Sequence, residues 1–417
     1  MNSTLPFHHS SLLLTTPMKQ KEKPSSYSDI LKQQQTELEG SKTNQILDTR
    51  LVEEFKGISF SQFKLTDVKK RFMTSVLESN MEESICWSLE CIASGHFLEL
   101  WDCIIMLMSC HIHSGNPKLP IYIQKRMNIF RNIMNTVGIS TPNSILRLRN
   151  HHTIRELFCE IVCILCVSPK RNKYQTVKVD KENDFDMVHL NHRLLAPSQE
   201  YGKLVFQKND PTDMFIALNE FVYAIHPEEK EKNLMNAWFW IEWLFLYEQK
   251  LKKKKISCTI QKRNIDTIEE KYQTDLIWIV WDAIFYMVKK KPPIYGHIIQ
   301  ALFDLYTLRY RPALKRKRRF LLYFAISVLI EPLDMNLPLV YQKERIQKMK
   351  RSIGKYYSFL KQCEVIDEEE LKKDEEGIQK PFILNSVKGK KKGKKEKKGK
   401  EKELDDLTKL KLSLTFS

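Results

Sequence analysis

Seven cations fall within eleven residues between Arg309 and Arg319, which gives this segment the clearest chemical capacity in the chain. Lys and Arg side chains neutralise phosphates and release counterions, and aromatic rings can stack on bases. An apolar run, Phe320–Ile330, follows directly and is typical of a buried helix, so the cations would be held on a rigid element. The predicted nucleic-acid-binding residues here are Arg309, Arg311, Lys315, Arg316, Lys317, Arg318 and Arg319, with Tyr306 and Tyr310 between them.

Two other interpretations of this cluster remain open. A solvated basic turn or a nuclear-import signal would have the same composition. The placement also raises an electrostatic conflict, because the N-terminus of a helix already carries partial positive charge. A bound anion would relieve that conflict.

Two further basic runs accompany the cluster. Lys252, Lys253, Lys254 and Lys255 follow a tryptophan-rich helical segment, and we predict that they contribute to the same nucleic-acid contact. Residues 388–402 contain ten Lys and two Glu, a net charge of +8. A segment with so little apolar content cannot fold, so it would bind nucleic acid without sequence preference or act as an import signal.

A group of thiols and imidazoles invites comparison with a zinc site. Cys103, Cys110, His111 and His113 are close in sequence, but their spacing matches no closed four-ligand pattern. Cys110 and His111 are adjacent and would diverge on a helix. The sequence therefore predicts no metal and no other cofactor.

The sequence contains none of the common catalytic motifs. It has no Gly-x-x-x-x-Gly-Lys-Ser/Thr, Gly-x-Gly-x-x-Gly, His-Glu-x-x-His or Gly-x-Ser-x-Gly pattern. Several carboxylates lie beside aromatic residues and could hold a metal or act as acid/base groups if buried. We predict that the chain is not an enzyme; the alternative is a metal-dependent activity on Glu90, His96, Asp102 or the Cys110–His113 group, with Glu242 and Asp282 as further carboxylates.

Composition agrees with a helical, polyanion-associated protein. Of 417 residues 42% are apolar and only 12 are Gly, fewer than a fold with many tight turns requires. The formal charge of +17 leaves about +9 without residues 388–402, and such a balance favours nucleic acid as a partner. No signal peptide or membrane span is evident, and nine scattered Cys indicate a reducing compartment. We therefore expect an intracellular protein, in a host nucleus or a cytoplasmic viral factory.

Helical periodicity begins near Leu51 and predicts an all-α fold. Helix starts are predicted at Asn80 with Glu83, at the capping box of Thr153 with Glu156, and at Thr267 with Glu270 before Trp278; Gly95 is predicted to end the helix that starts at Asn80. The helices would form a multi-helix array, in one elongated domain or two packed halves, with disordered tails at both ends. A polar, proline-containing stretch interrupts the pattern and is predicted to be a loop with one short strand near Lys203–Phe206. The predicted divisions are a tail at 1–48, helical regions at 49–167 and 210–363, the polar segment 168–209, and an acidic linker with a Lys-rich tail at 364–417.

Two blocks of the sequence carry a resemblance to a known family. The first runs from Met81 to Leu119 and includes Trp87, Ser94-Gly95-His96, Leu100-Trp101 and Ser114-Gly115-Asn116-Pro117-Lys118; the second includes Trp240-Ile-Glu-Trp243 and continues from Lys271 to Trp281. Both look like proteins of uncharacterised function from nucleocytoplasmic large DNA viruses, over about half of the chain. The resemblance implies a viral protein of no known chemistry.

The first block also resembles the helical C-terminal collar region of clamp-loader-type ATPases. Trp87, Gly95 and Asn116-Pro117 carry that likeness, but the chain has no ATPase module. Only an oligomerisation or collar role could carry over.

Together these features predict a non-enzymatic, nucleic-acid-associated accessory protein of viral replication or transcription. It would contact the phosphate backbone without sequence specificity. The alternative is a protein-interaction scaffold whose basic runs serve nuclear import or solubility.

Overall fold

The structure is a computed structural model that describes residues 45–48, 50, 52, 54–138, 142–226 and 233–364. Contacts divide the chain into Met1–Gln45 and Ile46–Ser417. Of the first unit only Gln45 is described, so the fold is that of the second unit. The predicted tails at 1–48 and 364–417, with the basic run at 388–402, lie outside the described residues except for 45–48 and Glu364.

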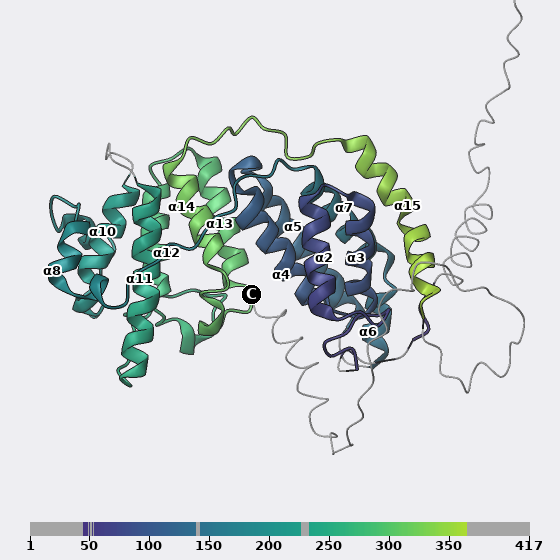
Figure 1. The fold of residues 1–417 in the computed structure, drawn as a ribbon, viewed down its shortest axis with the longest axis horizontal. Coiled ribbons are helices and arrows are strands. Elements are labelled where there is room, and N and C mark those ends of the chain that lie inside the picture. Colours follow the sequence, from purple (N-terminus) through teal and green to yellow (C-terminus); the bar gives the residue numbers. More distant parts are fainter. Residues whose placement is uncertain are drawn as a thin grey trace, which may run out of the picture. The chain divides into compact units, whose positions relative to one another are not determined.

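The described residues form an all-α fold, which confirms the predicted fold class (Figure 1). They contain fourteen α-helices and no strand, and their only β-type pairings are two isolated bridges, Ile58 with Lys64 and Thr259 with Asp275. None of the described helices is long and apolar enough to cross a membrane. The helices are α2 Leu65–Leu77, α3 Met81–Ala93, α4 Phe97–Leu107, α5 Leu119–Val137, α6 Pro142–Arg149, α7 His152–Val167, α8 Met187–Leu190, α9 Glu200–Lys203, α10 Phe215–Ile225, α11 Leu234–Lys253, α12 Ile277–Val288, α13 Pro293–Thr307, α14 Arg319–Ile330 and α15 Lys343–Lys361.

Local sequence signals set several helix ends as expected. The Asn80 side chain accepts a hydrogen bond from the Glu83 N–H at 3.2 Å and so caps α3 as predicted, and its amide donates to the Glu83 carboxylate. Gly95, at φ +73°, takes the left-handed conformation that ends the same helix. The capping box predicted at Thr153 with Glu156 is wrong, because Thr153 lies inside α7, whose N-cap is His151.

A second expected start is also wrong. Thr267 and Glu270 were predicted to begin the helix of Trp278, but Glu270–Tyr272 form only a 3₁₀ turn, and α12 begins at Ile277. Asp275 explains the later start, because its carboxylate accepts the Ile277 N–H at 3.1 Å. That contact satisfies a donor that the first turn of a helix leaves free.

The polar segment 168–209 is not one open loop. It runs irregularly to residue 182 and then forms α8, α9 and short 3₁₀ turns; α9 ends at Lys203, and no strand follows at Lys203–Phe206. Side chains of α10 hold it in place. Asn219 accepts the Gly202 N–H at 2.8 Å, and Glu220 accepts the Leu195 N–H at 2.8 Å. Side-chain acceptors on a neighbouring helix therefore replace the backbone pairing that a strand would have given.

The helices pack in two groups that meet along α5 and α13. In one group α2, α3, α4, α5, α6 and α7 contact one another, and in the other α9, α10, α11, α12, α13 and α14 do so. The last helix, α15, does not stay with the group that precedes it in sequence. It packs against α3 and α7 (Figure 1), so the predicted region 210–363 is divided between the two groups.

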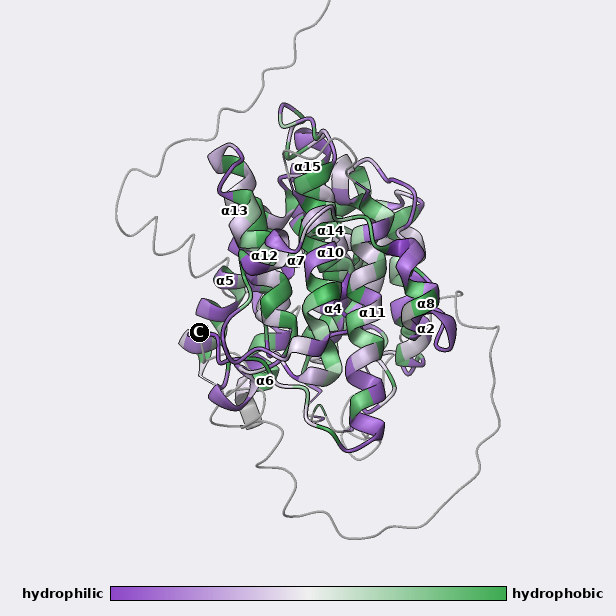
Figure 2. Cartoon of the chain, turned by 90° about the vertical axis from the view of Figure 1, so that its left-hand side faces the viewer, coloured by the Kyte–Doolittle hydropathy of each residue, from purple (hydrophilic) through white to green (hydrophobic). Residues whose placement is uncertain are grey.

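Hydropathy shows why the helices pack this way. Figure 2 shows hydrophobic residues along the middle of many helices and hydrophilic residues concentrated at helix ends and in loops. Helix α11 is buried from Ala237 to Phe245 and becomes hydrophilic toward its C-terminal end, where the lysines begin. Trp240, Trp278 and Trp281 are among the largest side chains that are fully buried, so these tryptophans belong to the core.

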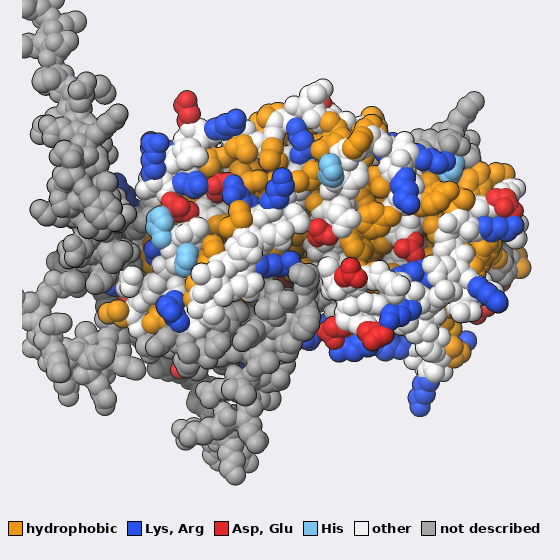
Figure 3. Space-filling model, turned by 180° about the vertical axis from the view of Figure 1, so that it is seen from behind, with side chains coloured by type: hydrophobic (Ala, Val, Ile, Leu, Met, Phe, Trp, Pro, Cys, Tyr) orange, Lys and Arg blue, Asp and Glu red, His pale blue; other side chains and the backbone are white. Residues whose placement is uncertain are grey.

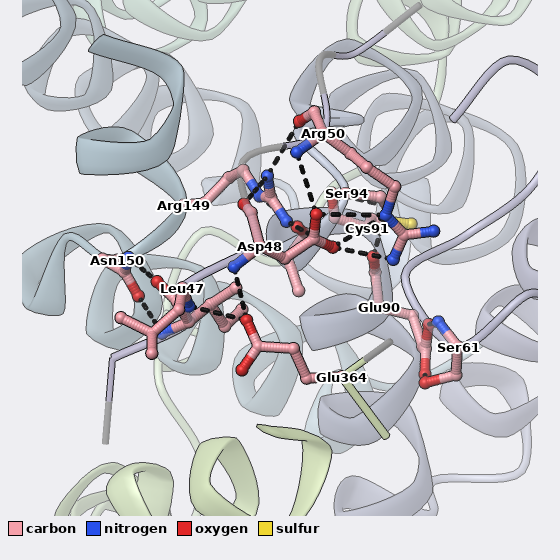
Figure 4. Close-up of polar contacts among 12 residues, drawn as sticks. Leu47, Asp48, Arg50, Ser61, Glu90, Cys91, Ser94, Arg149, Asn150 and Glu364 are labelled. Carbon is pink, nitrogen blue, oxygen red and sulfur yellow. Dashed lines mark hydrogen bonds and ion pairs between the residues drawn. The ribbon is translucent and has the colours of Figure 1, made fainter. Parts of the chain in front are cut away.

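One buried cation joins three distant segments of the first group (Figure 4). Arg149, 1% exposed, ends α6 and donates hydrogen bonds to the carbonyl oxygens of Ala93, Asp48 and Arg50, and its guanidinium lies 3.4 Å from the Asp48 carboxylate. Glu364, just after α15, accepts the Asp48 N–H at 2.5 Å. Both ends of the described chain are thus fixed at this point.

Candidate nucleic-acid interface

The predicted basic segment is a sharp connection between α13 and α14. Arg309 adopts φ +51°, a left-handed conformation, just after α13 ends, and Pro312 opens a 3₁₀ turn. Helix α14 begins at Arg319. The chain therefore reverses direction within the segment, and its seven cations cannot all face one side.

Lys315 points into the protein, which corrects its predicted role. It is 3% exposed, and its ammonium lies 2.5 Å from the Asp275 carboxylate and 2.6 Å from that of Glu248. A lysine this deeply buried requires such partners, because removing an unpaired ammonium from water costs several kcal/mol. Lys315 therefore fastens α11 to the start of α12 and is unavailable to a phosphate.

Arg319 and Arg316 also dock on α11. Arg319 contacts the buried Glu242 carboxylate at 3.0 Å, and Tyr323 donates to the same carboxylate at 2.9 Å. Arg316 donates to the Phe245 carbonyl at 3.0 Å and to the Gln249 side chain at 3.1 Å. Glu242 thus supplies the anion that the N-terminus of α14 was expected to need, and it comes from the protein itself.

Arg318 is buried as well, so it too is withdrawn from the predicted interface. It is 8% exposed and donates to the carbonyl oxygens of Tyr306 and Leu308 at the end of α13. Such carbonyls have no partner within their own helix, so a guanidinium is a suitable donor to them. Arg318 therefore caps the C-terminal end of α13.

The two predicted stacking residues are core residues. Tyr306 is fully buried and Tyr310 is 4% exposed. Their rings pack against Trp278, with centroids 6.2 Å and 4.5 Å from the indole. No base could reach them without opening the core, which contradicts their predicted role in base stacking.

Besides Arg316 and Arg319, which are partly exposed, three cations of the segment keep some access to solvent. Arg311 is exposed and Arg309 is partly exposed. Lys317 is exposed but forms an ion pair of 2.5 Å with Asp102 on α4. An exposed pair of this kind is weak and can open at little cost. The segment therefore offers a much smaller cationic surface than its sequence indicates.

The second predicted run, Lys252 to Lys255, is exposed throughout. Across the described ranges no carboxylate lies within ion-pair distance of any of the four lysines. The run also lies near the first segment, because Gln249, which binds Arg316, is three and four residues before Lys252 and Lys253 and so shares their face of α11. Of the predicted interface, Arg316 and the first lysines of this run therefore lie close together, at the end of α11.

The cations of α15 were not singled out in the sequence. Its 19 residues include seven Lys or Arg and one Glu. Ile346, Met349, Ile353, Tyr357 and Leu360 are buried on one side, which leaves Lys348, Arg351 and Lys355 along the other. Their spacing of three and four residues was visible in the sequence, and helical periodicity applied to cations would have found them.

Cations elsewhere are interspersed with other side chains. Figure 3 shows Lys and Arg side chains spread over the face seen from behind, with acidic and hydrophobic side chains between them. That face carries no single wide cationic field. Any polyanion contact must therefore rest on local arrangements such as the end of α11 or the row on α15.

The carboxylates considered for catalysis have structural partners. Glu90 accepts from the Ser61 hydroxyl at 2.5 Å, and burial raises its pKa. Asp282 contacts Arg263 at 2.6 Å in a cleft of about 620 Å³ lined partly by residues 204–207 and 261–265. Asp102 and Glu242 pair with cations of the basic segment, as described above. Asp282 shares Arg263 with a second carboxylate, the buried Asp210, which lies 2.7 Å from the guanidinium.

His96, His113 and Cys110, which were considered for a metal site, each contact a backbone carbonyl group of another segment. The His96 Nε2 lies 2.8 Å from the Ile58 carbonyl, and the His113 Nε2 lies 3.0 Å from the Asn172 carbonyl. Burial lowers the pKa of His113 to about 4, so this ring is neutral at pH 7. Cys110 is buried beside the Tyr174 carbonyl. Within the described part of the chain no three His, Cys, Asp or Glu residues are grouped as a metal site would require.

Comparison of the chain with protein-family models, with curated proteins and with solved structures found no match.

Proposed function

We propose that this protein is a non-enzymatic accessory protein that associates with nucleic acid through its phosphate backbone. We propose further that it serves viral replication or transcription, although the resemblance to large-DNA-virus proteins implies only a viral protein of no known chemistry. The observation that carries the proposal is the run Lys252–Lys255, four exposed lysines without an acidic partner among the described residues. Such cations bind phosphates by releasing counterions.

The neighbours of this run strengthen the contact. Arg316 lies against the same face of α11, one turn before Lys252 and Lys253. Glu248, four residues before Lys252, contacts Lys315 at 2.6 Å and forms no ion pair with the exposed lysines. We define the α11 terminus as Lys252–Lys255 with Arg316.

Lysines at the end of a helix also have a purely structural use. They stabilise the negative end of the helix dipole by about 0.3–1 kcal/mol each at low ionic strength. The helix dipole accounts for lysines in the last turn of α11, but it falls off within that turn. Lys254 and Lys255 lie beyond the last helical residue, Lys253, so the dipole gives a weaker reason for them.

A salt titration tests the proposal. Fluorescence anisotropy of a labelled oligonucleotide at several salt concentrations should give an affinity that falls linearly on logarithmic axes. Replacing Lys252, Lys253, Lys254 and Lys255 by Gln should reduce the slope by about 3, because each lost phosphate contact removes roughly 0.7–0.9.

The matched control places the same charge change elsewhere. Lys56, Lys70, Lys178 and Lys208 are exposed and have no described ion-pair partner. Changing these four to Gln should alter the slope by less than about 1. Failure of the wild-type protein to bind at low salt, or equal slopes for both variants, would refute the proposal.

A protein-interaction scaffold is the second candidate, favoured by one observation. Figure 3 shows hydrophobic side chains over a broad part of the face seen from behind. Large exposed apolar areas are typical of protein contact sites. A pull-down with the full chain, with a chain lacking residues 380–417 and with the Lys252–Lys255 variant separates the two functions: a scaffold would capture the same partners with all three.

A further inference from the structure

We propose that α15 carries a binding face for single-stranded nucleic acid, formed by Lys348, Arg351, Lys355 and Phe359. This inference builds on the proposed function, and it names the form of nucleic acid and a second contact surface. We call these four side chains the α15 face.

The three cations form a straight row. They are separated by three and four residues, so they lie on one side of the helix over about 10 Å at a rise of roughly 1.5 Å per residue. All three are exposed, and across the described residues none has a carboxylate within ion-pair distance. Glu344 occupies the same side one turn earlier and marks where the cationic row begins.

Phe359 continues the row by one more turn. It follows Lys355 by four residues, and its side chain is 48% exposed. It is also the only large hydrophobic residue of α15 that is exposed to this degree among the described ones. An aromatic ring aligned with spaced cations is the arrangement that single-strand-binding proteins use, because cations follow the phosphates and the ring stacks on an unpaired base.

The helix is held rigidly on the protein beneath. The Tyr357 hydroxyl donates to the Arg149 carbonyl at 2.9 Å, and the Arg155 guanidinium lies 3.9 Å from the centre of the Tyr357 ring. On one flank the Lys350 ammonium lies 2.7 Å from the Glu160 carboxylate. Because the helix is already fixed, binding through its cations does not carry the entropic cost of ordering the helix.

Charges around the helix leave the row available. On one flank Glu160 is already shared by Lys350 and by Arg126. On the other flank Glu82 influences the pKa of Tyr356, which burial raises first and the Glu82 charge raises further. Neither carboxylate forms an ion pair with Lys348, Arg351 or Lys355. Glu344, on the same side as the row, forms no ion pair with Lys348 either. Within the described part of the chain the row therefore faces solvent without an ion-pair partner, which suits a phosphate chain.

Single strands should be preferred over duplexes for a stereochemical reason. In a duplex the base faces are stacked on one another, so Phe359 would gain nothing beyond the phosphate contacts. A single strand can turn one base toward the ring. Base–aromatic stacking is worth roughly 1–3 kcal/mol, which corresponds to an affinity change of about 5- to 150-fold.

The experiment measures anisotropy of a labelled 20-nucleotide oligothymidine and of a 20-base-pair duplex with the full chain. Phe359→Leu keeps the apolar bulk and removes the ring, so it should weaken single-strand binding by roughly tenfold and leave duplex binding unchanged. Phe359→Trp should retain or improve single-strand binding. A triple change of Lys348, Arg351 and Lys355 to Gln should lower the single-strand salt slope by about 2.

Two further variants keep the outcomes distinct. Lys56, Lys178 and Lys208 changed together to Gln are the matched control and should leave the slope unchanged within about 0.5. If the variant of the α11 terminus loses binding while the α15 variants behave as wild type, the inference is wrong and the proposed function stands. If wild type binds neither probe at low salt, both are wrong.

Displacement by an acidic protein tract is the remaining outcome. Poly-glutamate that displaces the oligothymidine at equal charge concentration would show that the α15 face recognises acidic polypeptide, which overturns the inference. Retention of the oligothymidine, with loss on Phe359→Leu, supports it. Circular dichroism and thermal unfolding of each variant confirm that the fold is intact.

Discussion

Two basic segments of this protein have opposite relations to solvent. Arg309–Arg319 is the densest cationic stretch in the described chain, yet Lys315 and Arg318 are buried and Arg319 is paired with Glu242. In α15 the cations are more widely spaced, but Lys348, Arg351 and Lys355 remain exposed. Cationic density in sequence therefore does not measure cationic surface in the fold.

The difference arises from what surrounds each segment. The first is a chain reversal between two buried helices, so its side chains point in several directions and meet Glu242, Glu248 and Asp275. Helix α15 has one buried side and one solvent side, and its spacing of three and four residues keeps the row on the latter. Four predictions test this contrast, from the largest expected effect to the smallest.

Lys315→Ala should produce the largest loss of stability. It leaves the carboxylates of Glu248 and Asp275 near each other without their cation, and breaking a buried pair in this way costs about 3–5 kcal/mol. Urea unfolding at pH 7 measures the change. Lys317→Ala, in the same segment but exposed, should cost less than about 1 kcal/mol. Similar losses for both would show that the contrast between buried and exposed cations is wrong.

Asp48→Asn should cost slightly less, roughly 3 kcal/mol, because Arg149 would keep its carbonyl contacts but lose its only carboxylate partner among the described residues. The same unfolding measurement applies. Asp180→Asn is a suitable control, since Asp180 is an exposed carboxylate in a turn. An unchanged midpoint for Asp48→Asn would show that the Arg149 junction contributes little.

Acid should weaken the same junction. Burial raises the pKa of Asp48, but hydrogen bonds from Arg50 and the charges of Arg149 and Arg50 outweigh it, so the net pKa lies below the usual value of 3.8. A depressed carboxyl pKa stabilises the fold above the unfolded-state pKa, and that stabilisation is lost as pH falls through the folded-state pKa. The stability difference between wild type and Asp48→Asn should therefore shrink below about pH 4. A constant difference down to pH 2 would contradict the assignment.

The triple change of Lys348, Arg351 and Lys355 to Gln should have the smallest effect on stability, within about 0.5 kcal/mol of wild type. These side chains have no described partner to lose. Urea unfolding at low and high salt should give the same midpoint shift. A loss above about 2 kcal/mol would mean that these three cations stabilise the fold, as Lys315 does, and that the two basic segments do not differ in this respect.

Several elements were predictable because their signals are local. The Asn80 cap of α3 and the stop at Gly95 depend on neighbouring residues, and both are present. The box at Thr153 failed because α7 had already begun at His152. The candidate site was predicted less well. Exposure of Lys252–Lys255 follows from the polar end of a helix, whereas burial of Tyr306 and Lys315 depends on α11 and α12, which are distant in sequence.

The amino-acid sequence determined that this protein is helical, because apolar residues recur at helical spacing and caps act over a few positions. It also determined that the chain is basic, since charge is a property of composition. Only the tertiary structure decided which cations face solvent and that α15 packs on α3 and α7. Carboxylates brought from remote helices neutralise one basic segment and leave another free, and no local pattern records which carboxylate will meet which cation.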